Sequence, residues 1–180
     1  MCFSSSTQRG VALLASMVFL LLLTLLGLTA METAVQQEKM TGSVQHANHS
    51  FQAAETALRS GESWVALQWS AIAVCSSPAR CAPPAEVRTQ LSPGIHPVSA
   101  VHWIGAADGL YGVQNLGLSI APADFPATTL TRLYRVTGIG LYGQSRTVLE
   151  SVYAHYQDED AEEGGAGSRQ LSRIMWRQIQ

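Results

Sequence analysis

The feature that most constrains this chain is an uninterrupted apolar stretch near its N-terminus. The range Val11–Met31, about 21 residues, carries no charge, and a stretch of that length is typical of a membrane-spanning helix. Its only polar side chains are Ser16, Thr24 and Thr29. With a rise of roughly 1.5 Å per residue, such a helix is about 30 Å long, which matches the hydrocarbon core of a bilayer. A charge at its centre would oppose insertion by about 2.5–3.5 kcal/mol. The sequence therefore predicts that this segment enters a membrane.

The residues before the apolar stretch distinguish between kinds of membrane protein. Met1–Gly10 form a short polar leader in which Arg9 is the one basic residue. A secretory signal peptide has an apolar region of roughly 7–15 residues and then a small-x-small cleavage site. Here the apolar run is longer, and the bulky Leu28 lies two places before the candidate site at Ala30. Two alternatives remain, which are cleavage ahead of the helix at Gly10–Val11 and an uncleaved single-pass anchor.

A basic residue, a glycine and then an apolar helix resemble the processing signature of type IV prepilins and pseudopilins. The next residues, Met31–Ser63, read METAVQQEKMTGSVQHANHSFQAAETALRSGES. The order of motifs from Gln8 to Glu62 resembles the PilX group of minor pilins, which belong to type IV pilus machines. The resemblance implies removal of the leader after Gly10 by a membrane prepilin peptidase, and N-methylation of Val11.

One position departs from the pattern of major pilins. Those proteins carry a glutamate at the fifth residue after the cleavage site, where it pairs with the N-terminal amine of a neighbouring subunit. The corresponding residue here is Ala15. Because an intramembrane carboxylate is costly and normally needs a partner, its absence makes the helix easier to insert. Among pilin-like proteins, the missing glutamate resembles the subset at a filament tip. Alternatively, Ala15 is simply another membrane-facing residue.

The resemblance implies a structural protein of type IV pilus biogenesis, which packs by its helix into an initiating or tip complex. The implied partners are other minor and major pilins, the prepilin peptidase and the lipid of a bacterial inner membrane, with a tip adhesin as a further candidate. Arg9 fits the positive-inside tendency, which places the N-terminus in the cytoplasm and the C-terminal domain in the periplasm before incorporation into the pilus.

Two other classes of function compete with this interpretation. A type II secretion pseudopilin shares the leader, the helix and the missing glutamate. Its domain usually carries a large helical insertion, and this chain is too short to hold one. An uncleaved single-pass sensor or binding protein would keep its leader and would not associate with filaments.

The net charge is −2 and the sequence has no basic run, so we expect no nucleic-acid partner.

No pattern typical of catalysis or metal binding stands out. The chain has neither a G-x-S-x-G elbow nor a phosphate-binding loop. His46 and His49 are three residues apart, but a di-metal bundle would need carboxylates on further helices, so we interpret them as exposed. The acidic run Gln157–Gly167 lacks the ligand order of a calcium loop and is interpreted as a solvated connector. We therefore expect no enzyme, no cofactor and no metal.

The cysteines are consistent with an extracytoplasmic domain. Cys2 lies in the leader, whereas Cys75 and Cys81 are close together in the motif CSSPARC. In an oxidising compartment, a disulfide closing so small a loop would contribute about 2 kcal/mol. A zinc site would need further ligands nearby, which the sequence lacks. Free buried thiols are the alternative to the disulfide.

Helical periodicity continues after the membrane segment. Apolar or small residues follow one another at spacings of three, four and seven, which predicts a seam packed on the globular domain. The seam consists of Met40, Val44, Ala47, Phe51, Ala54, Leu58 and Val65.

The clearest β signal comes late in the chain. Two runs rich in β-formers, 130–138 and 145–156, flank a glycine-containing segment and predict a β-hairpin. Gly138, Gly140 and Gly143 are interpreted as its turn. In the second run Glu150 interrupts an otherwise apolar face, which consists of Val148, Val152, Ala154 and Tyr156.

The last segment of the chain has its apolar residues at helical spacing, so that Leu171, Ile174 and Met175 share one helical face.

The fold class that we predict is α+β and type IV pilin-like, with a long N-terminal helix packed on a small antiparallel sheet. The predicted parts are the leader 1–10, the membrane or filament-core helix 11–31, its amphipathic continuation 32–69, a globular domain 70–156 that ends in the hairpin, and an acidic linker with a C-terminal tail 157–180.

Overall fold

The computed structural model describes residues 8–120, 130–157 and 169–179. The chain divides into two compact units, Met1–Gln45 and His46–Gln180. Most of the predicted leader, and the acidic connector after Gln157, lie outside the described residues.

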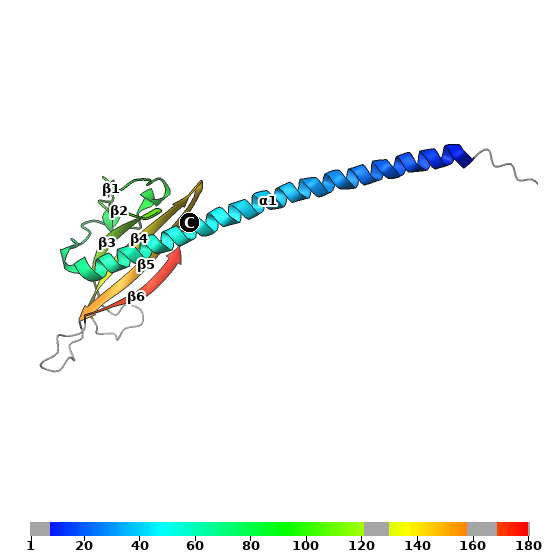
Figure 1. The fold of residues 1–180 in the computed structure, drawn as a ribbon. Helices are drawn as coiled ribbons and strands as arrows, with labels where there is room; N and C mark the ends of the chain where they lie inside the picture. Colours follow the sequence, from blue (N-terminus) through cyan, green and yellow to red (C-terminus); the bar gives the residue numbers. More distant parts are fainter. Residues whose placement is uncertain (1–7, 121–129, 158–168, 180) are drawn as a thin grey trace, which may run out of the picture. The chain divides into compact units, whose positions relative to one another are not determined.

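One helix, α1, extends over 61 residues from Gln8 to Gln68, and the 3-10 turn η1, Trp69–Ala71, follows it. The remainder of the second unit is an antiparallel sheet whose strands are hydrogen-bonded in chain order (Figure 1). A short helix α2 and a 3-10 turn η2 lie between η1 and the first strand. The bounds are α2 Pro78–Cys81, η2 Ala85–Arg88, β1 Gly94–Ile95, β2 His102–Ala106, β3 Gly109–Ile120, β4 Leu130–Tyr142, β5 Ser145–Gln157 and β6 Arg169–Gln178. The predicted α+β fold class is confirmed.

The predicted hairpin is the pair β4 and β5. Its strands pair from Arg132 and His155 to Tyr142 and Ser145. Gly143 lies in the turn with φ of 58°, a left-handed conformation that glycine adopts without steric cost. The hairpin prediction is therefore confirmed, and both strands extend beyond the predicted ranges.

Two of the glycines assigned to the turn belong instead to the middle of β4. Gly138 and Gly140 face α1, and the helix backbone lies directly against them. A Cβ added to Gly140 would lie 1.9 Å from the Ser50 carbonyl oxygen and 2.2 Å from the Ala54 nitrogen. A Cβ at Gly138 would lie 2.6 Å from the Ala54 carbonyl oxygen. The turn interpretation was wrong for these two residues, because they provide room for a helix that only the folded chain brings there.

The sheet face under α1 carries the larger apolar cluster. Successive side chains of a strand alternate between faces, so Tyr134 and Val136 of β4 share the face of Gly138. The core between helix and sheet consists of Ala54, Leu58, Val65, Tyr134, Val136, Leu149 and Tyr153. The predicted seam is thus buried from Ala54 to Val65, whereas Met40 and Val44 are exposed.

The opposite face of the sheet is covered by the connection between α1 and β2. Trp103 and Ile139 are completely buried there. Their cluster also contains Val87, Val101, Leu110 and Val148. Glu86, from η2, is buried above this face and accepts a hydrogen bond from Trp103 Nε1 at 3.3 Å and another from the Ser99 hydroxyl. The carboxylate thus fixes an otherwise irregular segment to the sheet.

The helical expectation for the C-terminal segment is wrong, because residues 169–178 form the edge strand β6. Val152 pairs with Met175 and Tyr153 pairs with Arg173, so that Ile174 is an extra residue in a β-bulge. The bulge interrupts the two-residue alternation of the strand. That interruption explains why the apolar residues of this segment have the spacing of a helix.

The close approach of helix and strand predicts that Gly140→Ala destabilises the protein by about 3 kcal/mol, since the added methyl group meets backbone atoms. Gly105→Ala is the matched control, because a Cβ there meets only Pro93 Cγ at 3.5 Å. Chemical denaturation of the detergent-solubilised chain measures both variants. Equal unfolding free energies for the two variants would contradict the role assigned to Gly140.

Burial raises the pKa of Tyr153, and a hydrogen bond with the Glu62 carboxylate adds to the effect. The folded protein therefore keeps this phenol protonated above pH 10.0, where the unfolded chain ionises. We expect the unfolding free energy to fall as the pH rises above 10, and to fall less in Tyr153→Phe. Stability measurements between about pH 9 and 11.5 test this, with Tyr142→Phe at a more exposed tyrosine as control. Identical pH profiles for the wild type and Tyr153→Phe would refute the expectation.

Candidate assembly site

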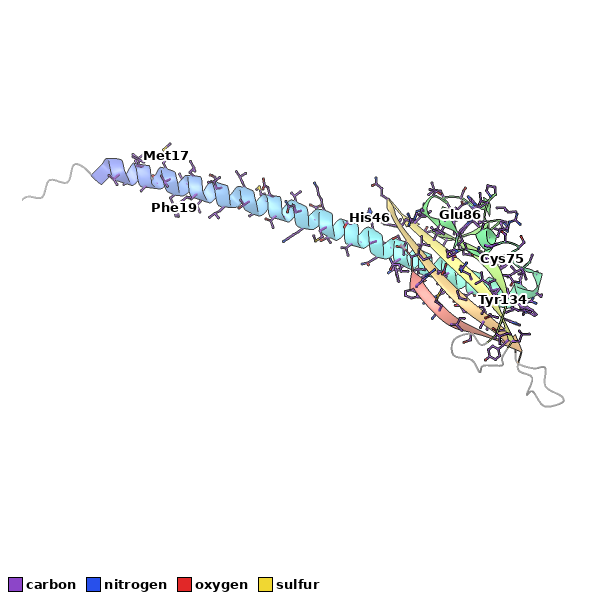
Figure 2. All side chains as sticks on the ribbon, turned by 180° about the vertical axis from the view of Figure 1, so that it is seen from behind. Met17, Phe19, His46, Cys75, Glu86 and Tyr134 are labelled. Atoms are coloured by element: carbon purple, nitrogen blue, oxygen red, sulfur yellow. A yellow bond between two sulfur atoms is a disulfide. The ribbon has the colours of Figure 1, made fainter. Side chains whose placement is uncertain are left out.

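The first half of α1 is an apolar surface that no other described part of the chain covers. Large apolar side chains from Val11 to Met31 are between 48 % and 72 % exposed. Figure 2 shows Met17 and Phe19 projecting from opposite sides of this segment. Among the described residues, α1 is the helix long and apolar enough to cross a membrane. A monomer in water would leave this surface exposed at a large cost in free energy, so the segment requires lipid or other apolar helices.

The polar side chains in the apolar segment are bonded within the helix. Ser16 Oγ donates to the Leu13 carbonyl, Thr24 to Leu21 and Thr29 to Leu26, at 2.8, 2.8 and 2.9 Å. An unbonded hydroxyl in hydrocarbon would cost several kcal/mol. These bonds remove that cost, so the hydroxyl groups do not oppose burial of the helix.

The residues predicted for processing lie at the beginning of α1. Gly10 and Val11 are both exposed, and they lie in the first turn, where backbone N–H groups have no acceptor within the helix. Ala15 is exposed one turn later and lines one shallow apolar surface together with Val11 and Leu14. The structure thus places Ala15 and Val11 on one side of the helix.

The two predicted cysteines are joined. A disulfide links Cys75 and Cys81, whose Cα atoms are 5.3 Å apart. The loop encloses α2, and the Ser77 side chain accepts a bond from the Arg80 amide as its N-cap. Gln114 of β3 donates to the carbonyl oxygens of Arg80 and Ala82, at 2.5 and 3.1 Å, and so holds the loop on the sheet.

A buried charge cluster lies on the sheet face opposite α1, and sequence reasoning did not find it. The Glu150 side chain is completely buried, with Arg135 Nε 3.3 Å from Oε2 and Arg177 Nη2 2.8 Å from Oε1. Burial lowers the pKa of Arg135, the Glu150 charge raises it and the Arg177 charge lowers it. Removing one partner from a buried ion pair typically costs about 3–5 kcal/mol, so these residues depend on one another. The one signal in the sequence was a glutamate within an apolar strand face.

The histidines of interest are near the β4–β5 turn. His46 and His49 are exposed, as expected, and their rings contact Tyr142 at centroid distances of 5.2 and 4.5 Å. Within residues 8–120, 130–157 and 169–179, no three His, Cys, Asp or Glu side chains are grouped as metal ligands would be.

Comparison with known proteins relates the N-terminal part of the chain to a known family. Residues 9–59 match the family model described as PilX N-terminal. No curated protein and no solved structure matches the chain. The matched residues contain the exposed apolar segment, the Gly10–Val11 bond and Ala15. Over these residues, the N-terminal helical region of this chain is similar to the N-terminal region of the PilX family.

Proposed function

We propose that this chain is a minor pilin of an initiating or tip complex in type IV pilus biogenesis. The observation that supports this proposal most is the exposed, uncharged segment Val11–Met31 of α1, with Ala15 at the position where major pilins have a glutamate. In this proposal a prepilin peptidase removes Met1–Gly10 and the new N-terminus at Val11 is methylated. The mature helix first lies in the bacterial inner membrane and then packs beside the helices of other minor and major pilins.

The packing mechanism follows from the composition of the helix. Helices in lipid gain no hydrophobic free energy by associating, so close van der Waals fit drives their contact. Small residues such as Ala12, Ser16 and Gly27 allow backbones to approach, and an added Cβ at Gly27 meets no other atom of this chain within 4 Å. A pilin helix packed there would fill that space.

The architecture of the second unit favours a pilus over a type II secretion system. In the described residues, the strands follow one another in a simple antiparallel order, and the only α-helix besides α1 is α2, Pro78–Cys81. The large helical insertion usual in the tip-like pseudopilin is not found there. The second unit would then lie in the periplasm and finally at the pilus, where a tip adhesin is a candidate partner.

The first test is the N-terminus of the protein taken from native membranes. We expect an intact mass that corresponds to a chain beginning at N-methylated Val11. A Gly10→Leu variant should keep its leader, whereas Gly27→Leu, on the same helix, should be processed normally. A wild-type chain that still begins at Met1 or Cys2 would rule out prepilin processing and favour the uncleaved single-pass protein.

The second test concerns the position in the filament. A carboxylate introduced by Ala15→Glu needs an amine partner from a subunit above it, and a tip subunit has none. We therefore expect Ala15→Glu to lower the amount of this protein in sheared pili several-fold relative to the membrane fraction. Ala66→Glu, at an exposed position of α1 outside the apolar segment, should not change it. Increased incorporation of Ala15→Glu would indicate a subunit above this one and would contradict the tip position.

A further inference from the structure

A continuous chain of polar contacts joins the C-terminal strand to the disulfide loop. Arg177 of β6 donates to Glu150 Oε1 from Nε at 3.0 Å, and its Nη2 lies 2.8 Å from the same oxygen. Arg135 Nε lies 3.3 Å from Glu150 Oε2. The same guanidinium donates from Nη1 to the Cys81 carbonyl at 2.7 Å. Four segments of the chain thus meet along one line across β6, β5, β4 and the loop.

The middle of this line cannot be solvated. The Glu150 side chain is 0 % exposed and that of Arg135 is 12 % exposed, whereas that of Arg177 is 50 % exposed. If β6 leaves the sheet, Glu150 loses one of its two cations. Arg135 and Arg177 contact different oxygens of this one carboxylate, so each guanidinium fixes the orientation in which the other pairs with it.

The disulfide holds in place the second acceptor of Arg135, which is the Cys81 carbonyl. The Cys81 carbonyl belongs to α2, a helix of four residues, which is far too short to be stable alone. The disulfide and the bonds from Gln114 keep this helix on the sheet. Arg135 Nη1 also donates to Gln114 Oε1 at 3.1 Å, so the loop, Gln114 and Arg135 form one network. Opening the disulfide would remove one of the restraints on the Cys81 carbonyl, which accepts from the Arg135 guanidinium.

We propose that the Cys75–Cys81 disulfide and the docking of β6 are energetically coupled through Arg135 and Glu150, so that oxidation of the cysteines favours the completed sheet. The redox step is exchange with a small thiol. Two thiol molecules transfer two electrons and two protons to the protein, which gains two cysteine thiols, and leave as one symmetrical disulfide. The coupling makes docking of the C-terminal strand more favourable in an oxidising compartment.

Coupling between two equilibria is reciprocal. If reduction of the disulfide weakens the docking of β6 by some factor, undocking of β6 must make the disulfide easier to reduce by the same factor. The chain offers a matched pair of variants for this test. Arg177 and Arg173 lie on the same strand, and their side chains are 50 % and 52 % exposed. Each pairs with a glutamate, but Arg173 pairs with Glu62 of α1 at 3.7 Å, on the other face of the sheet.

The first experiment measures the thiol–disulfide equilibrium of the full, detergent-solubilised chain in glutathione buffers. We expect Arg177→Gln to make the Cys75–Cys81 disulfide about fivefold or more easier to reduce, which is a typical size for coupling between sites. Arg173→Gln should leave the equilibrium unchanged. Cys2 is replaced by serine in all samples, so that only the pair of interest titrates. Equal shifts in the two variants, or no shift in either, would overturn the proposal.

The second experiment reads the coupling in the opposite direction by hydrogen exchange. Reduction of the wild type should accelerate exchange of the β6 amides by the factor found in the first experiment. The amides of β2 are the internal reference, because that strand carries no residue of the network. In Arg135→Lys, a single ammonium keeps a charge near Glu150 but lacks the fork that also reaches Cys81, so reduction should no longer accelerate β6 exchange. Unchanged β6 exchange on reduction of the wild type, or equal acceleration in Arg135→Lys, would refute the coupling.

Discussion

The close contact between the backbone of α1 and β4 determines the arrangement of the folded unit. At Gly138 and Gly140 the helix lies so near to the strand that any side chain there would collide with Ser50 or Ala54. The helix therefore crosses the sheet where β4 presents no side chains. Beyond the contact, larger side chains such as that of Tyr134 fill the space between the helix and the twisted sheet. One pair of glycines thus determines which residues of α1 become core.

The two faces of the sheet are covered by different means. On one face a regular helix buries apolar side chains efficiently. On the other face an irregular connection lies over the strands, and polar anchors fix it there. Glu86 is bonded to Trp103, Arg146 donates to the carbonyls of Val87 and Gln90, and Gln114 holds the disulfide loop. Irregular backbone has carbonyl groups that need donors, so arginine and glutamine side chains on the sheet supply what a helix would supply internally.

Features of short sequence range were predictable, and features that need a distant partner were not. The long helix and the β4–β5 hairpin follow from local periodicity, and the spacing of Cys75 and Cys81 pointed to the bond that the structure contains. Strand β3 was missed because its glycines hide the pattern. One of them, Gly112, is required because a Cβ there would lie 2.6 Å from Val101 Cγ1.

The candidate site also combines features that local sequence predicts with features that depend on distant partners. The apolar helix was evident from the sequence, because it is a property of consecutive residues. The roles of Gly10, Val11 and Ala15 stay predictions, since they depend on a peptidase and on neighbouring subunits. Glu150 was noticed only as an irregularity in a strand face. Its partner Arg177 lies 27 residues away, across a bulge, and no local pattern connects the two.

The hydrogen bonds of Ser16, Thr24 and Thr29 within the helix affect how easily the apolar segment moves from lipid to a surface of other helices. Because each hydroxyl already has its acceptor one turn back, the side chains of the apolar segment offer no unmet donor to lipid or to a neighbouring helix. The segment can leave one nonpolar surrounding for another without exchanging a side-chain hydrogen bond. Such a helix is not tied to one rotational setting by polar contacts, and shape alone selects the neighbours with which it comes to rest.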